Sequence, residues 1–204
     1  MSFNPEWTLY RTGKDAERVL TGEQAKDRIE RFEQHAEHLP FRAAMEIVRN
    51  VQEHFKQPYD PAAPSRRYPL AYWLHYYLKE ALLVRGGTVK FFTAVNSLLD
   101  LHHGVDGFVD YQTPDGLVVT APFDLTLNEA KFAGGTHGHF IVPVTEEMIE
   151  SPEVVKEQSR FISEDLLMRL AYQEKCLRVR LKPAPEFKIP VFRRRRRVPP
   201  KQAA

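Results

Sequence analysis

The chain has 204 residues, of which 43% are hydrophobic and only Cys176 is a cysteine, so full disorder, a disulfide framework and a cysteine-based zinc cluster are excluded. No apolar run approaches the ~20 residues of a membrane-spanning helix, and the first residues lack a secretory pattern, so we expect a soluble, cytoplasmic protein without a membrane partner. The net charge of +2 is uneven: residues 175–204 carry +10 and the remainder carries −8. This asymmetry predicts that the C-terminal end binds a polyanion.

The first half of the chain is predicted to be helical. Thr21 and Gln24 have the spacing of a capping box, and Thr88 has the place of a helix N-cap before a run of apolar residues that Gly104 ends. Four prolines between residues 58 and 69 predict a loop. We therefore expect helices over residues 22–38, 41–57, 70–84 and 88–103.

The pattern changes after Gly104, where short alternating segments replace the helical spacing. Thr113–Gly116, with the sequence Thr-Pro-Asp-Gly, predicts a tight turn between the first two strands, and Pro143 places the last of them at a sheet edge. Residues after Pro183 show no apolar periodicity, and we expect them to be disordered. The predicted elements are strands over 105–111, 117–127 and 139–144, a helix over 152–176 and a final strand over 177–181.

These elements predict a single α+β domain in which helices flank a small mixed β-sheet. We expect three parts along the chain: a helical N-terminal extension over 1–60, an α/β core over 61–182 and a basic tail over 183–204.

Acidic residues of the predicted strands form the strongest candidate site. Asp106 and Asp110 are four residues apart, so both face the same side of the sheet, and Asp124 lies on the polar face of the next strand. If the two strands pair, Asp106 or Asp110 lies near Asp124. Two close carboxylates suit a hard divalent cation such as Mg²⁺ or Mn²⁺.

A helix, a strand with an aspartate, and a neighbouring strand with an acid and a lysine together resemble the PD-(D/E)XK nuclease superfamily, over roughly residues 88–175. The resemblance implies a restriction-endonuclease-like fold and a Mg²⁺-dependent deoxyribonuclease, that is, a hydrolase of DNA phosphodiester bonds. Asp106 and Asp124 would be the metal-binding acids, with Asp110 or Glu129 assisting. Thr126 stands where the motif has its lysine, and Lys131 would take that role.

A second register fits the letters of the motif better. In it Pro114–Asp115 is the PD pair and Glu129–Lys131 is the (D/E)XK triplet. It fits the predicted structure less well, because Pro-Asp-Gly is typical of a turn. Glu80, on the preceding helix, would be the additional acid that some members of the superfamily carry.

The tail holds the clearest electrostatic feature, a run of five arginines. Such a run binds phosphates by counterion release without sequence preference, so we expect DNA or another nucleic acid as the partner. A nuclease of this size with a basic tail would suit a phage, a mobile element or a repair system. The run comprises Arg193, Arg194, Arg195, Arg196 and Arg197.

Other interpretations stay open. The protein would instead be a non-catalytic nucleic-acid-binding or assembly protein, whose acidic body packs or forms a homo-oligomer, or an immunity-type partner whose acidic body mimics nucleic acid. His102–His103 and the His137-Gly-His139 pair offer imidazole ligands for a transition metal, although no third ligand has a recognisable spacing. The aromatic helix around Trp73 would pack in a core or stack bases.

Overall fold

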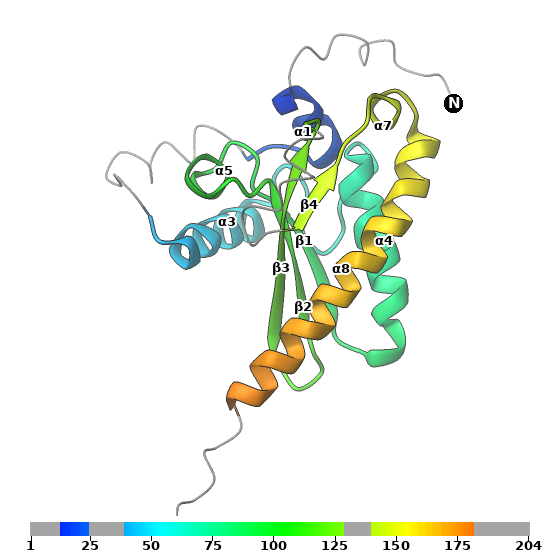
Figure 1. Cartoon of the computed structure of the whole chain (residues 1–204). Helices are drawn as coiled ribbons and strands as arrows, with labels where there is room; N and C mark the ends of the chain where they lie inside the picture. The colour runs from blue at the N-terminus through cyan, green and yellow to red at the C-terminus, as the bar shows by residue number, and fades with distance from the viewer. Residues whose placement is uncertain (1–12, 25–38, 129–139, 182–204) are drawn as a thin grey trace, which may run out of the picture.

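The computed structural model describes residues 13–24, 39–128 and 140–181, and its centre is a four-stranded mixed sheet with helices on both faces (Figure 1). The strands lie in chain order across the sheet. The first three are antiparallel to one another, and the fourth is parallel to the third. They are β1 (Thr88–Thr93), β2 (Gly107–Gln112), β3 (Val118–Thr126) and β4 (Phe140–Pro143).

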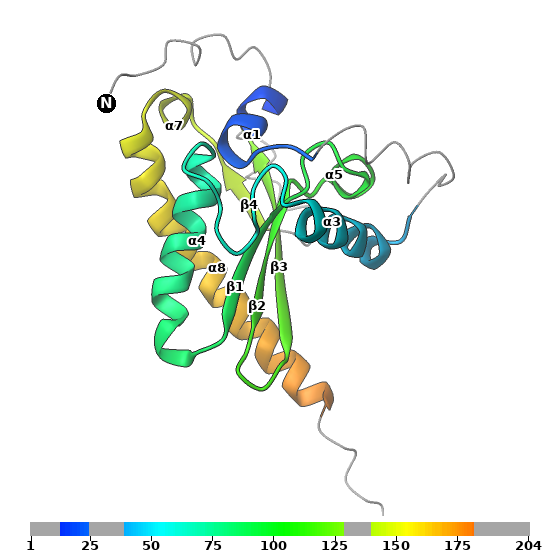
Figure 2. The same ribbon diagram turned by 180° about the vertical axis from the view of Figure 1, so that it is seen from behind.

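One face of the sheet is covered by two long helices, α4 (Pro69–Leu82) and α8 (Pro152–Leu181), which also pack on each other (Figures 1 and 2). Alternate residues of the strands point to this face, as the period of a pleated strand requires. The short helices α1 (Gly13–Thr21) and α7 (Glu146–Glu150) close one end of the layer. The fully buried side chains of this core include Leu20, Leu74, Phe91, Val109, Phe123 and Leu166.

The opposite face carries a smaller core beneath α3 (Phe41–Phe55) and α5 (Leu98–His103). Phe92 and Phe108 stack with ring centroids 4.8 Å apart, and Val48 of α3 is buried against the same cluster. Helix α3 therefore packs directly on the sheet, and α1 packs against α4 and α7 at one end of the fold.

Most of the observed helices and strands agree with those predicted from the sequence. Helices α3 and α4 and strands β2, β3 and β4 lie where the sequence predicted them, with β4 at an edge of the described sheet. The turn over 113–116 joins β2 to β3. Gly116 donates its backbone N–H to the Thr113 carbonyl at 2.9 Å and has a φ of 87°, a conformation that glycine adopts without a steric penalty.

Two predictions of secondary structure are wrong. The helix predicted from Thr88 is a strand, β1, because the β-branched and aromatic residues of 88–93 pair in register with β2; the helix begins only after Ser97. The strand predicted over 177–181 is the last turn of α8, where Arg178 bonds Glu174 one turn earlier and Asp115 of the β2–β3 turn.

The capping box at Thr21 is also wrong. Thr21 is the last residue of α1, and its hydroxyl donates to the Glu17 carbonyl at 2.8 Å instead of capping a following helix. Most of the helix predicted over 22–38 lies outside the described residues, as do the arginine-rich tail and residues 129–139. Among the described helices, none combines the length and apolar character needed to cross a membrane.

Candidate metal centre

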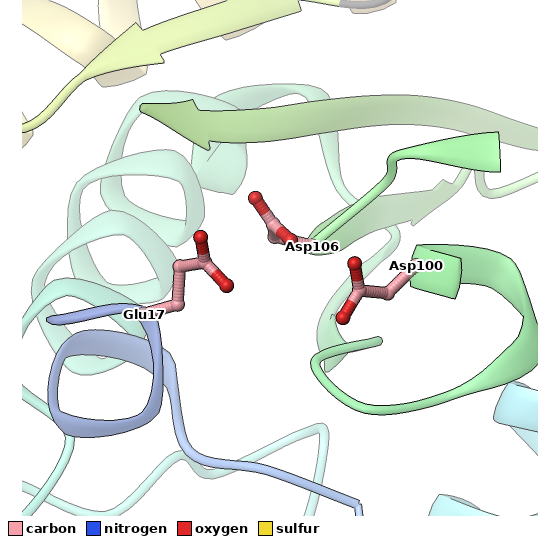
Figure 3. Close-up of side chains that lie close together, drawn as sticks. All are labelled: Glu17, Asp100 and Asp106. Carbon is pink, nitrogen blue, oxygen red and sulfur yellow. The ribbon is translucent and has the colours of Figure 1, made fainter. Parts of the chain in front are cut away.

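Three carboxylates from distant parts of the chain meet at one end of the sheet (Figure 3). Glu17 comes from α1, Asp100 from α5, and Asp106 from the residue before β2. One carboxylate oxygen of each lies within 4.8 Å of the others. Asp106 is 3% exposed and Asp100 is 8% exposed, so the cluster is largely removed from water.

The short helix α5 positions Asp100. The hydroxyl of Ser97 caps this helix by accepting the backbone N–H groups of Leu99 and Asp100 at 3.1 and 3.4 Å. The Oδ2 atom of Asp100 accepts the Asn96 backbone N–H at 2.9 Å and the Lys14 ammonium at 2.6 Å. Asp100 is therefore held between its own helix terminus and α1.

A close backbone approach positions Asp106. Its Oδ2 atom accepts the Leu125 backbone N–H at 2.7 Å, and its own N–H donates to the Phe123 carbonyl at 3.1 Å. A Cβ on the next residue, Gly107, would lie 2.4 Å from Cζ of Phe123 and 2.9 Å from the Phe92 carbonyl oxygen. Only glycine fits there, and the absent side chain lets Asp106 sit directly against β3.

The cluster carries more negative charge than its surroundings balance. Burial, followed by the repulsion from Glu17, raises the pKa of Asp106 to about 9; Asp100 and Asp124 add to this, and the Leu125 N–H opposes it. Burial alone would lower the pKa of Lys14, but its hydrogen bond to Asp100 and the neighbouring acids raise it overall. A carboxyl of this kind stays protonated near neutral pH until a further cation enters the cluster.

Asp124 lies beside this cluster. It is 5% exposed, and it follows Phe123, which pairs with Gly107, so Asp106 and Asp124 lie at the same end of the β2–β3 pair. Its charge is close enough to contribute to the raised pKa of Asp106. The pairing of these two strands thus brings Asp106, rather than Asp110, next to Asp124.

Asp110 lies elsewhere, about 13 Å further along β2 by the rise of a strand. Its carboxylate accepts Arg49 Nε at 2.7 Å and Nη2 at 3.0 Å, and also accepts the Thr120 hydroxyl at 2.6 Å. The guanidinium of Arg49 also lies over the Phe108 ring. These contacts give Asp110 a structural role in joining α3 to the sheet.

Of the two acids in the second register, the structure describes Asp115, whereas Glu129 lies outside the described residues. Asp115 lies in the β2–β3 turn, at the opposite end of the strands from Asp106, and forms a two-pronged ion pair with Arg178 at 2.7 and 3.1 Å. The hydrogen bond from Arg178, followed by one from Thr113, lowers the pKa of Asp115. Glu80 is exposed on α4. The structure therefore places Asp106 next to Asp124 and Asp115 at the opposite end of these strands.

Thr126 stands at the position where the motif has its lysine, so the described end of β3 has no positively charged side chain there. Thr126 closes β3, and its hydroxyl accepts the Asn128 backbone N–H at 3.1 Å. The remaining predicted site residues lie outside the described residues: Glu129, Lys131, His137, His139 and Arg193–Arg197. His103 contacts the Leu39 carbonyl through a ring nitrogen at 2.9 Å and lies edge-on to Phe41, as a structural residue would.

Sequence reasoning missed two of the three carboxylates, Glu17 and Asp100, and also Lys14, which bonds Asp100. Lys14 and Glu17 lie one turn apart on α1, a spacing found on any exposed helix. Asp100 lies in the sequence Asp-Leu-His-His, where the two histidines are the more evident candidate ligands. Their approach depends on tertiary packing, because Lys14 and Asp100 are 86 residues apart.

A separate hollow lies on the same face of the sheet but nearer the β2–β3 turn. Its volume is about 650 Å³, and Arg42, Arg49 and Lys90 give it cationic groups, balanced by Glu46, Glu53 and Asp110. The cluster around Asp106 does not line it.

No protein-family model matches the chain, and no curated protein or solved structure matches it either. The site is therefore interpreted from its own geometry.

Proposed function

We propose that this protein is a metal-dependent nuclease with a restriction-endonuclease-like fold, which hydrolyses phosphodiester bonds of DNA. The observation that carries the proposal is the meeting of Glu17, Asp100 and Asp106 within 4.8 Å, with Asp124 beside them on the paired strand. The mixed sheet with helices on both faces is consistent with it.

The donor set fits a hard divalent cation. Carboxylate oxygens are the ligands of Mg²⁺, and at a metal–oxygen distance of about 2.1 Å opposite ligands stand ~4.2 Å apart. The separations in the cluster, up to 4.8 Å, need only a small side-chain adjustment to reach this. The raised pKa of Asp106 also favours a cation at this place, because a divalent cation would offset the repulsion that keeps the proton bound.

Each residue then has a defined task. Asp106, Asp100 and Glu17 would hold Mg²⁺ or Mn²⁺, and Asp124 would add a further negative charge beside them. The bound cation would supply an activated water and neutralise charge on the phosphate. Lys14, half exposed and already bonded to Asp100, orients the water or stabilises the phosphate oxygens, a role that Lys131 would otherwise fill.

A second candidate function is favoured by the burial of these acids. Asp106 and Asp124 expose 3% and 5% of their surface, which leaves little room for a DNA strand in this conformation. In this alternative the protein binds nucleic acid through its arginine-rich tail, and the cluster stabilises the fold.

The deciding experiment measures Mg²⁺- and Mn²⁺-dependent cleavage of plasmid and single-stranded DNA by the wild type and by the variants Asp106→Asn and Asp124→Asn. Asp115→Asn is the matched control, since Asp115 is the corresponding acid of the other register. We expect cleavage that both site variants lose and the control retains, with DNA binding unchanged. Absence of cleavage with either metal, together with retained DNA binding, would support the second candidate instead.

Two further measurements separate metal binding from catalysis. Calorimetric titration with Mn²⁺ should give a binding signal that Asp106→Asn abolishes, whatever the DNA substrate. Comparison of Lys14→Ala with Lys131→Ala then assigns the lysine, because the variant of the functional residue should bind Mn²⁺ normally and cleave at least about a hundredfold more slowly. Equal activity of Lys14→Ala and the wild type would remove Lys14 from the mechanism.

A further inference from the structure

Helix α8 carries a second apolar surface on the side opposite the core. Its buried residues, such as Ile162, Leu166 and Leu170, face the sheet and α4. Four large apolar residues face outward instead, and α8 runs across the front of the molecule in Figure 1. They are Phe161 (56% exposed), Met168 (65%), Tyr172 (70%) and Val179 (60%).

The outward residues form one straight stripe. Phe161 and Val179 are separated by about five complete turns of 3.6 residues, so they point in the same direction. Asp165 and Lys175 occupy the intervening positions and are also exposed. The resulting spacing of four and three residues alternately, over 161, 165, 168, 172, 175 and 179, is that of a coiled-coil seam.

We propose that this stripe is the interface of a homodimer in which the α8 helices of two copies pack antiparallel about a two-fold axis next to residue 170. In that orientation the positions of the stripe are related symmetrically about residue 170. Phe161 then faces Val179 of the second copy, and Met168 faces Tyr172.

The charges select the same arrangement. In the antiparallel pair each Asp165 faces Lys175 of the second copy, so the two polar positions of the seam form two ion pairs related by symmetry. In a parallel pair Asp165 would face Asp165 and Lys175 would face Lys175, which is repulsive. Both side chains are exposed, and no hydrogen bond or ion pair joins either of them to another described residue.

The surroundings of the axis also suit a second helix. Ala171 lies beside the axis and is small enough to let two helices approach closely. Arg169, which would otherwise crowd the axis, is turned toward β4 and lies over the Phe140 ring at 5.0 Å. A hollow of about 640 Å³ borders the stripe, lined in part by Phe140, Met168 and Tyr172, and can accept side chains of the second copy.

The test is the oligomeric state of the full chain, freed of nucleic acid, measured by sedimentation equilibrium over a series of concentrations. We expect a reversible dimer. Asp165→Lys and Lys175→Asp should each weaken it about tenfold, because each creates two like-charged pairs, and the double variant should restore it. Met168→Asp should abolish it, whereas Val84→Asp, at a 96% exposed apolar residue outside the stripe, should not.

Every other outcome overturns the proposal. A monomer at all concentrations means that the stripe is not an interface between copies. A dimer that tolerates Met168→Asp uses another surface. Weakened single variants without recovery in the double variant exclude the antiparallel register. Circular dichroism of each variant confirms the fold, which substitutions at exposed positions should leave intact.

Discussion

Lys14 Nζ lies 2.6 Å from Oδ2 of Asp100, and this bond joins α1 to the short helix that follows β1. It supplies a positive charge to a cluster of buried acids. We expect Lys14→Met to destabilise the metal-free protein by about 1 kcal/mol, since the neighbouring carboxylates lose a partner while the half-exposed site moderates the effect.

Urea denaturation compares Lys14→Met with Lys14→Arg, which keeps the charge. Added Mn²⁺ should reduce the difference between the methionine variant and the wild type. An unchanged unfolding free energy in Lys14→Met would show that the ion pair makes no contribution.

The pKa of Asp106 predicts an unusual dependence of stability on pH. Its carboxyl is raised to about 9 in the folded protein from an ordinary value of 3.8, so the folded state keeps a proton that the unfolded state releases. The associated stability is complete below about pH 4 and is lost as pH rises toward 9, by up to ~1.4 kcal/mol per pH unit.

Asp106→Asn carries a neutral amide and should remove this dependence. The measurement is the unfolding free energy of the metal-free protein at pH 5, 7 and 9. The wild type should weaken across this series more than the variant does. Parallel curves for the two proteins would contradict the raised pKa.

The ion pair of Arg49 and Asp110 predicts that loss of Arg49 lowers the stability of the fold without a direct effect on catalysis. Both side chains are mostly buried, at 17% and 9% exposure, so removal of Arg49 leaves a carboxylate without compensation. We expect Arg49→Met to cost about 3 kcal/mol, and the double variant Arg49→Met/Asp110→Asn to recover part of it.

Thermal and urea unfolding measure these costs. Metal binding at the cluster should persist in the double variant, since Asp110 lies about 13 Å along the strand from Asp106. Loss of Mn²⁺ binding in a folded double variant would instead place Asp110 in the metal site.

The close approach at Gly107 predicts a strong steric effect. A methyl group there would lie 2.4 Å from Phe123 Cζ, so Gly107→Ala should destabilise the protein by about 2 kcal/mol or more and displace Asp106. Gly104, which caps α5 with a φ of 62°, has open space around it, so Gly104→Asn should have a much smaller effect. Chemical denaturation of the two variants makes the comparison, and equal stabilities would contradict the packing at Gly107.

Local signals in the sequence were sufficient to predict elements that begin or end at a proline or a glycine. Pro69 begins α4, Gly104 ends α5 and Gly116 completes the turn, each for a reason that acts within a few residues. The helix predicted from Thr88 was wrong, because the apolar spacing of 88–101 fits a helix and only the pairing of residues 88–93 with β2 selects a strand.

The site shows the same division. The spacing predicted that Asp106 or Asp110 lies near Asp124 once the two strands pair, and the register of that pairing selects Asp106. Glu17 reaches the cluster only because Ala16 and Leu20 on the same helix are buried in the core, a docking that no local pattern encodes.

The length of β2 sets the distance between the proposed metal site and the β2–β3 turn. The C-terminal end of helix α8 is joined to the β2–β3 turn by the ion pair of Arg178 and Asp115, whereas Asp106 lies at the other end of β2. The strand between them spans about 20 Å. That distance corresponds to roughly six base pairs of duplex DNA, so a duplex laid along β2 would extend about half a helical turn from the proposed metal site before it reached the β2–β3 turn.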